Sequence, residues 1–350
     1  MKKTIVIVSI ALWGVVALAA IGLIIASALG HNLSIGGENW MLNFGGGNVD
    51  MLREERISLD GTRQISVNVS YQDIQVRITD GGEAVIRHFD YDTAPPCNIG
   101  NSGGTVSVNT PNRVIINLFS FNFSNSPRLE IELPRAYAES VSFITTSGSV
   151  KTEGDANWGN TTLQSTSGSV RAEGALTCGD LTAKSTSGSV HLNQNVSGAT
   201  VRVTSTSGSV RIHESLTGTT VHISSTSGSV HVDGAVQCDE LTLKSTSGSV
   251  HTAGCTVTGG ARLNTTSGSI HTAAVRAKEI TAESMSGGLD MGILDAEGLI
   301  HLKSTSGSVK AEAVRSPEHY IRSASGGIDI RELTGKGDVR SNSGRVKTNY

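Results

Sequence analysis

Hydrophobic and polar positions follow a fixed period from residue 144 to the end of the chain. A Ser-Gly pair followed by Ser, Gly or Arg recurs there, with its first Ser at Ser147, Ser167, Ser187, Ser207, Ser227, Ser247, Ser267, Ser286, Ser306, Ser325 and Ser343. Six intervals of 20 residues are followed by intervals of 19, 20, 19 and 18. A period of about 20 residues without helical signals is typical of a β-solenoid, in which each repeat forms one coil.

Apolar residues occupy three constant phases of this period, and each phase predicts one inward-facing wall. The first lies four residues before the motif, at Leu163, Ala183, Val203, Ile223, Leu243, Leu263, Ala282, Leu302, Ile321 and Val339. The second lies three residues after the first Ser, at Val150, Val170, Val190, Val210, Val230, Val250, Ile270, Leu289, Val309, Ile328 and Val346. The third is anchored by Leu176, Val196, Leu216, Val236, Val257, Val275, Leu294, Val314 and Leu333. The fold class is therefore all-β, a single-stranded solenoid of roughly triangular section, in which each coil adds about 4.8 Å.

Small residues occupy two further positions that are constant from one repeat to the next. The residue two before the first Ser is always Ser or Thr and shares the inward face, where stacked hydroxyls can hydrogen-bond along the rod. The motif Gly is interpreted as a structural corner, where positive φ or close packing between coils excludes a Cβ. These corner glycines are Gly148, Gly168, Gly188, Gly208, Gly228, Gly248, Gly268, Gly287, Gly307, Gly326 and Gly344. A phosphate-binding loop is not expected, because no helix signal follows any copy.

The N-terminal segment predicts a membrane anchor. Residues 4–29 carry no charged side chain and follow Lys2 and Lys3. A helix of this length would reach roughly 39 Å, more than the ~30 Å hydrocarbon core of a bilayer. We predict a transmembrane helix at 4–29, a signal anchor, with residues 1–3 in the cytoplasm and the C-terminal region outside it. The alternative is a cleaved signal peptide, for which Ala26-Ser27-Ala28 offers a cleavage pattern.

Two regions are expected between the anchor and the repeats. Residues 30–56 are rich in Gly and show no regular apolar period, which predicts a juxtamembrane linker. Residues 57–143 alternate between apolar and polar positions in short runs, for example at Ile65, Val67 and Val69. We predict an irregular β region there that leads into the solenoid at 144–350.

Two segments at the start of the repeats resemble a known bacterial family. Residues Leu129 to Pro134 read Leu-Glu-Ile-Glu-Leu-Pro, and the stretch from Val141 to Val150 ends in Thr-Thr-Ser-Gly-Ser-Val. Both resemble the putative adhesin family, a domain of unknown function with recurrent T-x-S-G-[DS]-[IV] units. The resemblance covers about 57–350 and implies a β-solenoid on a cell-envelope protein, with an adhesive or stress-linked role. It supplies no catalytic residue, and this chain has Ser or Gly where the commoner motif has Asp.

A mostly basic column is expected on the outer face of the second wall, four residues after each first Ser. The candidate anionic-ligand column is Lys151, Arg171, His191, Arg211, His231, His251 and His271. It is interpreted either as a surface for an anionic envelope polymer or as an ordinary solvated face. His231, His251 and His271 would stack about 5 Å apart, which raises a metal site as a third interpretation. No Cys or carboxylate shares the column at those coils, so we predict neither a metal site nor another cofactor.

Charge and carboxylate spacing bear on the other function classes. Residues 144–350 contain 18 Lys and Arg against 18 Asp and Glu, so no nucleic-acid partner is expected. A polysaccharide-cleaving solenoid needs clustered carboxylates. Glu153, Glu173, Asp233 and Glu312 share one phase, six residues after the first Ser, but leave wide gaps between the pairs. The chain is therefore predicted not to be an enzyme.

The cysteine spacing predicts free thiols in the repeat region. Cys178 and Cys238 hold the same phase three coils apart, about 14 Å, which is too far for a disulfide. Cys238 and Cys255 lie on neighbouring coils but out of phase, so a bridge would require distortion. We expect these side chains to act as small apolar core residues.

These patterns together predict a membrane-anchored, extracytoplasmic solenoid that acts as an envelope binding, adhesion or scaffold module. The expected partners are the membrane and an envelope polymer or envelope protein. One alternative is a self-associating rod, a homo-oligomer, because no polar capping element follows the last motif. A further alternative is a polysaccharide-acting β-solenoid enzyme.

Overall fold

The computed structural model describes residues 33–37, 40–44, 49–91, 94–111, 114–118 and 126–349. Every regular element in these ranges is a β-strand, and they contain no helix that could serve as a membrane span. The predicted anchor at 4–29 and the segment 1–3 lie outside the described residues. The all-β prediction is confirmed for the described part of the chain.

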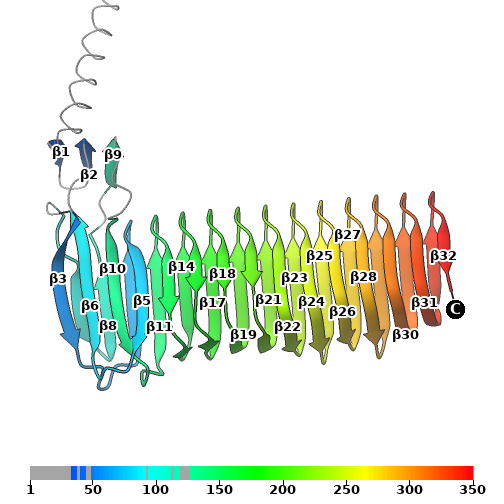
Figure 1. The fold of residues 1–350 in the computed structure, drawn as a ribbon, viewed down its shortest axis with the longest axis horizontal. Coiled ribbons are helices and arrows are strands. Elements are labelled where there is room, and N and C mark those ends of the chain that lie inside the picture. The colour runs from blue at the N-terminus through cyan, green and yellow to red at the C-terminus, as the bar shows by residue number, and fades with distance from the viewer. Residues whose placement is uncertain are drawn as a thin grey trace, which may run out of the picture.

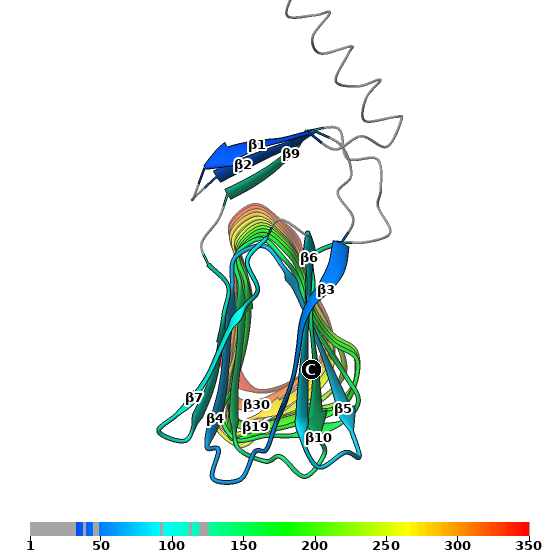
Figure 2. The same ribbon diagram turned by 90° about the vertical axis from the view of Figure 1, so that its left-hand side faces the viewer.

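The repeats form a rod of stacked coils, drawn from left to right in Figure 1 and end-on in Figure 2. The first wall, which leads into each motif, contains β4 (Gln64–Val69), β11 (Ser140–Thr145), β14 (Thr161–Ser165), β17 (Asp180–Ser185), β23 (Glu240–Ser245), β25 (Gly260–Thr265), β27 (Glu279–Ser284) and β29 (Leu299–Ser304). The second wall contains β5 (Asp73–Thr79), β12 (Val150–Glu153), β15 (Val170–Ala172), β18 (Val190–Leu192), β20 (Val210–Ile212) and β32 (Val346–Thr348). The third wall contains β13 (Ala156–Asn157) and β16 (Leu176–Thr177).

Longer strands continue from one wall into the next. The third wall runs into the first in β19 (Val196–Ser205) and β21 (Leu216–Ser225). The second wall runs into the third in β22 (Val230–Cys238), β24 (Val250–Val257), β26 (Ile270–Ala277) and β28 (Leu289–Ala296), and all three walls are joined in β30 (Val309–Ser323) and β31 (Ile328–Ser341). Equivalent residues of successive coils pair in parallel, as Val170 does with Val190 and Val190 with Val210. The predicted period of about 20 residues per coil is therefore confirmed.

The stack of coils begins earlier than residue 144. The strands predicted within 57–143 are present, but β4 and β5 pair in parallel with β11 and β12 and so form a coil without a Ser-Gly motif. Beyond them, β5 pairs with β10 (Arg128–Pro134), and β4 pairs with β8 (Thr105–Asn109). Three antiparallel neighbours complete this end, namely β6 (Ala84–Tyr91) on β10, β3 (Val49–Ile57) on β6, and β7 (Asn98–Ser102) on β8.

The interval 30–56, which was expected to be a linker, contains strands in its described residues. β1 (Leu33–Gly37), β2 (Trp40–Phe44) and β9 (Val114–Leu118) form a three-stranded sheet. The linker prediction needs correction for 49–56, since β3 pairs with β6 along its length. Its register shifts between Met51 and Arg53, and its buried residues are only Val49 and Ile57 at the two ends. This strand therefore carries no alternating apolar pattern by which it could be recognised.

The inward hydroxyl of each repeat joins two coils. The hydroxyl of Ser205 donates to the carbonyl oxygen of Gly188 in the preceding coil at 2.8 Å and accepts the amide of Gly208 in its own coil at 3.0 Å. The same two bonds are made by Ser165, Ser185, Ser225, Ser245, Thr265, Ser284, Ser304, Ser323 and Ser341. Thr145 of the first motif coil accepts the amide of Gly148 in the same way, but it donates to the carbonyl of Gln72, because the preceding coil has no motif.

Close packing, and not positive φ, explains the corner glycines. None of the eleven has a positive φ angle, whereas Gly61 and Gly154 do. A Cβ built on Gly208 would lie well under 3 Å from the backbone of Gly188 in the preceding coil. Backbone atoms held in a parallel ladder cannot move aside as a flexible side chain can. Of the two explanations offered by the sequence, close packing between coils is therefore the one that the geometry supports.

A register shift occurs between β22 and β24, near the middle of the rod. Val232 pairs with Thr252 but Ala235 pairs with Gly254, so two residues of β22 stand opposite the single residue Ala253 of β24. The sequence predicted Val257 as the successor of Val236 in the third wall. The structure places Cys255 there instead. Cys255 and Cys238 are both buried free thiols, as expected.

We expect Gly208→Ala to destabilise the rod by about 2 kcal/mol or more, because the new Cβ would collide with backbone of the preceding coil. Urea unfolding followed by circular dichroism measures this change. Gly254→Ala is the matched control, since a Cβ there would meet no atom within 4 Å. It should change stability by no more than about 0.5 kcal/mol. Equal effects of the two substitutions would contradict the packing explanation.

Candidate functional site

The predicted basic column exists as a continuous row on the outer face of the second wall. Backbone register links Lys151 to Arg171, Arg171 to His191, and so on through each successive coil to His271 and Asp290. A second outward row lies beside it, six residues after the first Ser, and begins with Glu153 and Glu173. This second row decides how much charge the face presents.

Carboxylates of the neighbouring row pair with the cations of the column. The ion pairs are Lys151–Glu153 at 2.6 Å, Arg171–Glu173 at 3.9 Å and Arg211–Asp233 at 3.0 Å. The hydrogen bond from Lys151 lowers the pKa of Glu153, so this pair stays charged well below neutral pH. Exposed pairs of this kind add little stability, but they cancel one another's field at a distance. The geometry therefore favours a neutralised face over a cationic track for an anionic polymer.

The three histidines at the centre of the column stack on one another. The ring centroids of His231 and His251 are 4.7 Å apart with 2° between the planes, and those of His251 and His271 are 4.7 Å apart with 8°. Parallel rings hold their nitrogen atoms side by side rather than directed at one point, as a metal ion at ~2.0–2.1 Å would require. Among the described residues no group of three or more His, Cys, Asp or Glu side chains could hold a metal ion.

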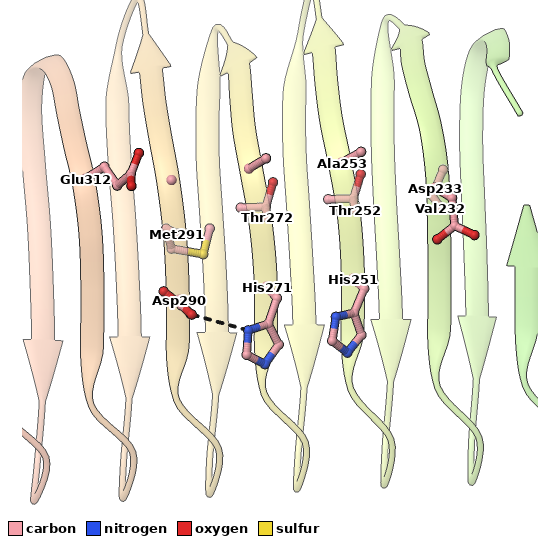
Figure 3. A pocket seen from close by; sticks show the side chains of 12 residues that line it. Val232, Asp233, His251, Thr252, Ala253, His271, Thr272, Asp290, Met291 and Glu312 are labelled. Atoms are coloured by element: carbon pink, nitrogen blue, oxygen red, sulfur yellow. Dashed lines mark ion pairs between the residues drawn. The ribbon is translucent and has the colours of Figure 1, made fainter. Parts of the chain in front are cut away.

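A groove of about 540 Å³ opens beside this stack. Its floor is formed by Ala253, Ala273 and Gly292 of the second row, and one side by His251, His271 and Asp290. Figure 3 shows Asp233 at one end of the groove and Glu312 at the other. Asp233 and Glu312 share one row and are four coils apart, about 19 Å at the ordinary strand spacing.

Sequence and backbone register together create the groove. Coils on either side carry Asp233 or Glu312 in the second row, whereas the coils between carry Ala, Ala and Gly, which have almost no side chain to fill the space. The groove also begins where Asp233 and Gly234 stand opposite the single residue Ala253. The recess therefore starts at the register shift and ends where the side chains lengthen again.

His231 and His251 are held toward their neutral form. Partial burial lowers the pKa of His251, and the neighbouring rings of His231 and His271 lower it further. Burial also lowers the pKa of His231, with Arg211 adding to the effect and Asp233 opposing it. His271 Nδ1 lies 3.5 Å from Asp290 Oδ2, the contact drawn as a dashed line in Figure 3. At neutral pH the groove thus presents the uncharged imidazole of His251, with carboxylates at its margin.

The sequence predicted the histidines along one side of the groove but not the small residues that form its floor. His251 and His271 belong to the predicted column, and the gap between Asp233 and Glu312 was visible in the second row. That gap was weighed only as an argument against clustered catalytic carboxylates. A run of small residues between two long ones on an outward row was the available signal, since it predicts a recess in a regular rod.

Comparison with protein families places the whole repeat region in one group. The family model described as Toastrack DUF4097 matches residues 62–235, 199–318 and 298–350, which together cover most of the chain. The chain belongs to the Toastrack DUF4097 family. The resemblance to a putative adhesin-like domain of unknown function is thereby confirmed. Among curated proteins no match to this Toastrack chain was found.

Three solved structures are similar to this Toastrack chain at low sequence identity. A putative adhesin from Parabacteroides merdae is 10% identical, with 89% of this chain and 100% of that chain covered and a TM-score of 0.35. A putative adhesin from Bacteroides fragilis is 13% identical, with coverage of 85% and 96% and a TM-score of 0.24. A putative cell adhesion protein from Clostridium sporogenes is 9% identical, with coverage of 85% and 99% and a TM-score of 0.20.

The lowered pKa of His251 predicts a pH-dependent stability. The unfolded chain takes up a proton at this residue near pH 6.5, whereas the folded chain does so only at lower pH. Above pH 6.5 His251 is neutral in both states and does not oppose folding. As the pH falls below 6.5, protonation of His251 stabilises the unfolded chain more than the folded chain, so the free energy of unfolding decreases. We expect His251→Gln to become progressively more stable relative to the wild type between pH 7.5 and pH 5. Parallel melting-temperature curves for the two proteins over this range would contradict the assignment.

Proposed function

We propose that this Toastrack chain is a binding module that holds an extended ligand in the groove beside the histidine stack. One observation carries the proposal: the second outward row has longer, polar side chains in the other coils and is recessed over Ala253, Ala273 and Gly292. The groove follows the rod axis, across equivalent positions of successive coils. Such a shape suits a chain-like ligand, which can contact one coil after another.

The proposal includes a location at the cell envelope. It is supported by the charge-free segment 4–29 behind Lys2 and Lys3, which has the length and composition of a membrane anchor. An anchored rod would carry the groove outside the cytoplasm, where polymers of the envelope are the accessible ligands. An adhesive or scaffolding role follows from this arrangement, and it requires no catalytic group.

Binding of the full chain to envelope fragments from the producing cells tests this function. Ala273→Arg would fill the groove with a long side chain and should weaken binding at least tenfold without changing the melting temperature. Ala199→Arg is the matched control, because Ala199 is exposed on β19 away from the groove. It should bind as the wild type does.

Charge reversal separates the groove from the basic column. Replacing Lys151 and Arg171 by Glu should leave groove binding unchanged, because neither residue lines the groove and their ion-pair partners, Glu153 and Glu173, do not line it either. Loss of binding in this double variant, with Ala273→Arg unaffected, would contradict the proposal and would place the binding site on the basic column instead. Absence of binding by the wild type would remove the proposed function altogether.

A further inference from the structure

The formally charged side chains of the groove are carboxylates at its margin. Lys and Arg are absent from its lining, and its floor is uncharged. The carboxylates at its margin already have partners, since Asp233 lies 3.0 Å from Arg211, Asp290 3.5 Å from His271 and Glu312 3.9 Å from Arg331. A strongly anionic ligand would face these carboxylates without a cation in the groove. A cationic ligand would have to compete with Arg211 and Arg331, which already pair with Asp233 and Glu312.

Hydrogen-bonding capacity is nevertheless concentrated along the groove. A neutral imidazole offers one N–H donor and one nitrogen acceptor. The ring centroids of His251 and His271 lie 4.7 Å apart, and Nδ1 of His271 is next to Asp290. The carboxylates of Asp233, Asp290 and Glu312 add acceptors around the margin, as Figure 3 shows. Between these polar edges the floor consists of Ala253, Ala273 and Gly292, with Met291 beneath it.

A polar edge beside a shallow apolar floor matches the chemistry of a sugar chain. Sugar rings present hydroxyl groups at their edges, which both donate and accept, and C–H groups on their faces, which pack on apolar surface. Consecutive rings of a linear glycan would meet consecutive coils of the rod. We infer that the groove binds a linear, uncharged glycan, with its hydroxyl groups on the imidazoles of His251 and His271 and its C–H faces over Ala253, Ala273 and Gly292.

This inference rests on the proposed function and names its ligand class. The neutral imidazole is the essential element, because protonation would turn its acceptor nitrogen into a second donor and add charge. The groups facing the stack are Arg211 and Asp233 near His231, and Asp290 next to His271. Binding should therefore be strongest near pH 7.5 and weaken toward pH 5.

Three hexasaccharides of different charge test the ligand class by isothermal titration calorimetry. They are the neutral hexamer of N-acetylglucosamine, its fully deacetylated cationic counterpart, and the anionic hexamer of galacturonic acid, with neutral cellohexaose as a second uncharged chain. The full chain is used, in a detergent without a sugar headgroup. We expect binding of at least one neutral hexamer, with the charged hexamers at least tenfold weaker.

Variants of the stack test the assigned side chains. His251→Leu combined with His271→Leu removes two pairs of hydrogen-bonding groups and should weaken binding about tenfold or more. The corresponding double replacement by Gln keeps a donor and an acceptor at each site and should restore part of the affinity. His191→Leu is the matched control, since His191 belongs to the same column but does not line the groove. Equal weakening by His191→Leu would overturn the assignment.

The outcomes for ligand class and for function are separable. Failure of both neutral hexamers to bind, or tighter binding of either charged hexamer, would overturn the glycan inference. If envelope fragments still bind the wild type and not Ala273→Arg under those conditions, the proposed function stands without this ligand. If neither fragments nor hexamers bind, both are wrong.

Discussion

The rest of this structure depends on a hydroxyl group that bridges two coils at the Ser-Gly corner. Ser225 illustrates it, since its hydroxyl donates to Gly208 of the preceding coil and accepts from Gly228 of its own coil. The bridge draws successive corners so close together that a Cβ on Gly228 would overlap the backbone of Gly208. Hydroxyl and glycine therefore require each other, and their joint recurrence sets the spacing of the rod.

A corner fixed in this way leaves the outward rows free to vary without loss of the fold. The wall strands bury Val210, Val230 and Val250 at equivalent positions, while the residues next to them on the outside change from Arg211 to His231 and His251. Variation on these rows produces ion pairs in some coils and a recess in others. The groove is thus a local difference in side-chain size along the second wall, and it begins at the register shift opposite Ala253.

The periodic part of the fold could be predicted from the sequence because the buried residues of each wall recur at one constant position in the repeat. Val150 and its successors were placed inside by a count of residues alone, and Lys151 and its successors outside. The partner of the inward hydroxyl could not be deduced, because the pattern shows that hydroxyls stack but not that backbone groups of Gly accept and donate. The register shift at Ala253 could not be predicted either. This coil has one residue fewer than the preceding coil at that point and one residue more before the next motif, so the interval between motifs remains 20 residues.

The N-terminal strands and the candidate site depended on contacts between separate parts of the chain. β3 lacks an alternating pattern because a register shift between Met51 and Arg53 interrupts it, so only its pairing with β6 reveals it. For the site, the column was predictable but its neutralisation was not. The contact between Arg211 and Asp233 joins residues in different rows and different coils.

Amide hydrogen exchange at Gly228, combined with urea unfolding of Ser225→Ala, tests the coupling of hydroxyl and glycine most directly. The variant leaves the Gly228 amide and the Gly208 carbonyl without their partner, so we predict a loss of about 1 to 3 kcal/mol and faster exchange at Gly228. Ser225→Thr should restore both, because Thr265 makes the same two bonds in its coil, and Ser224→Ala on the outer face should change neither. Wild-type stability and unchanged exchange in Ser225→Ala would contradict the account.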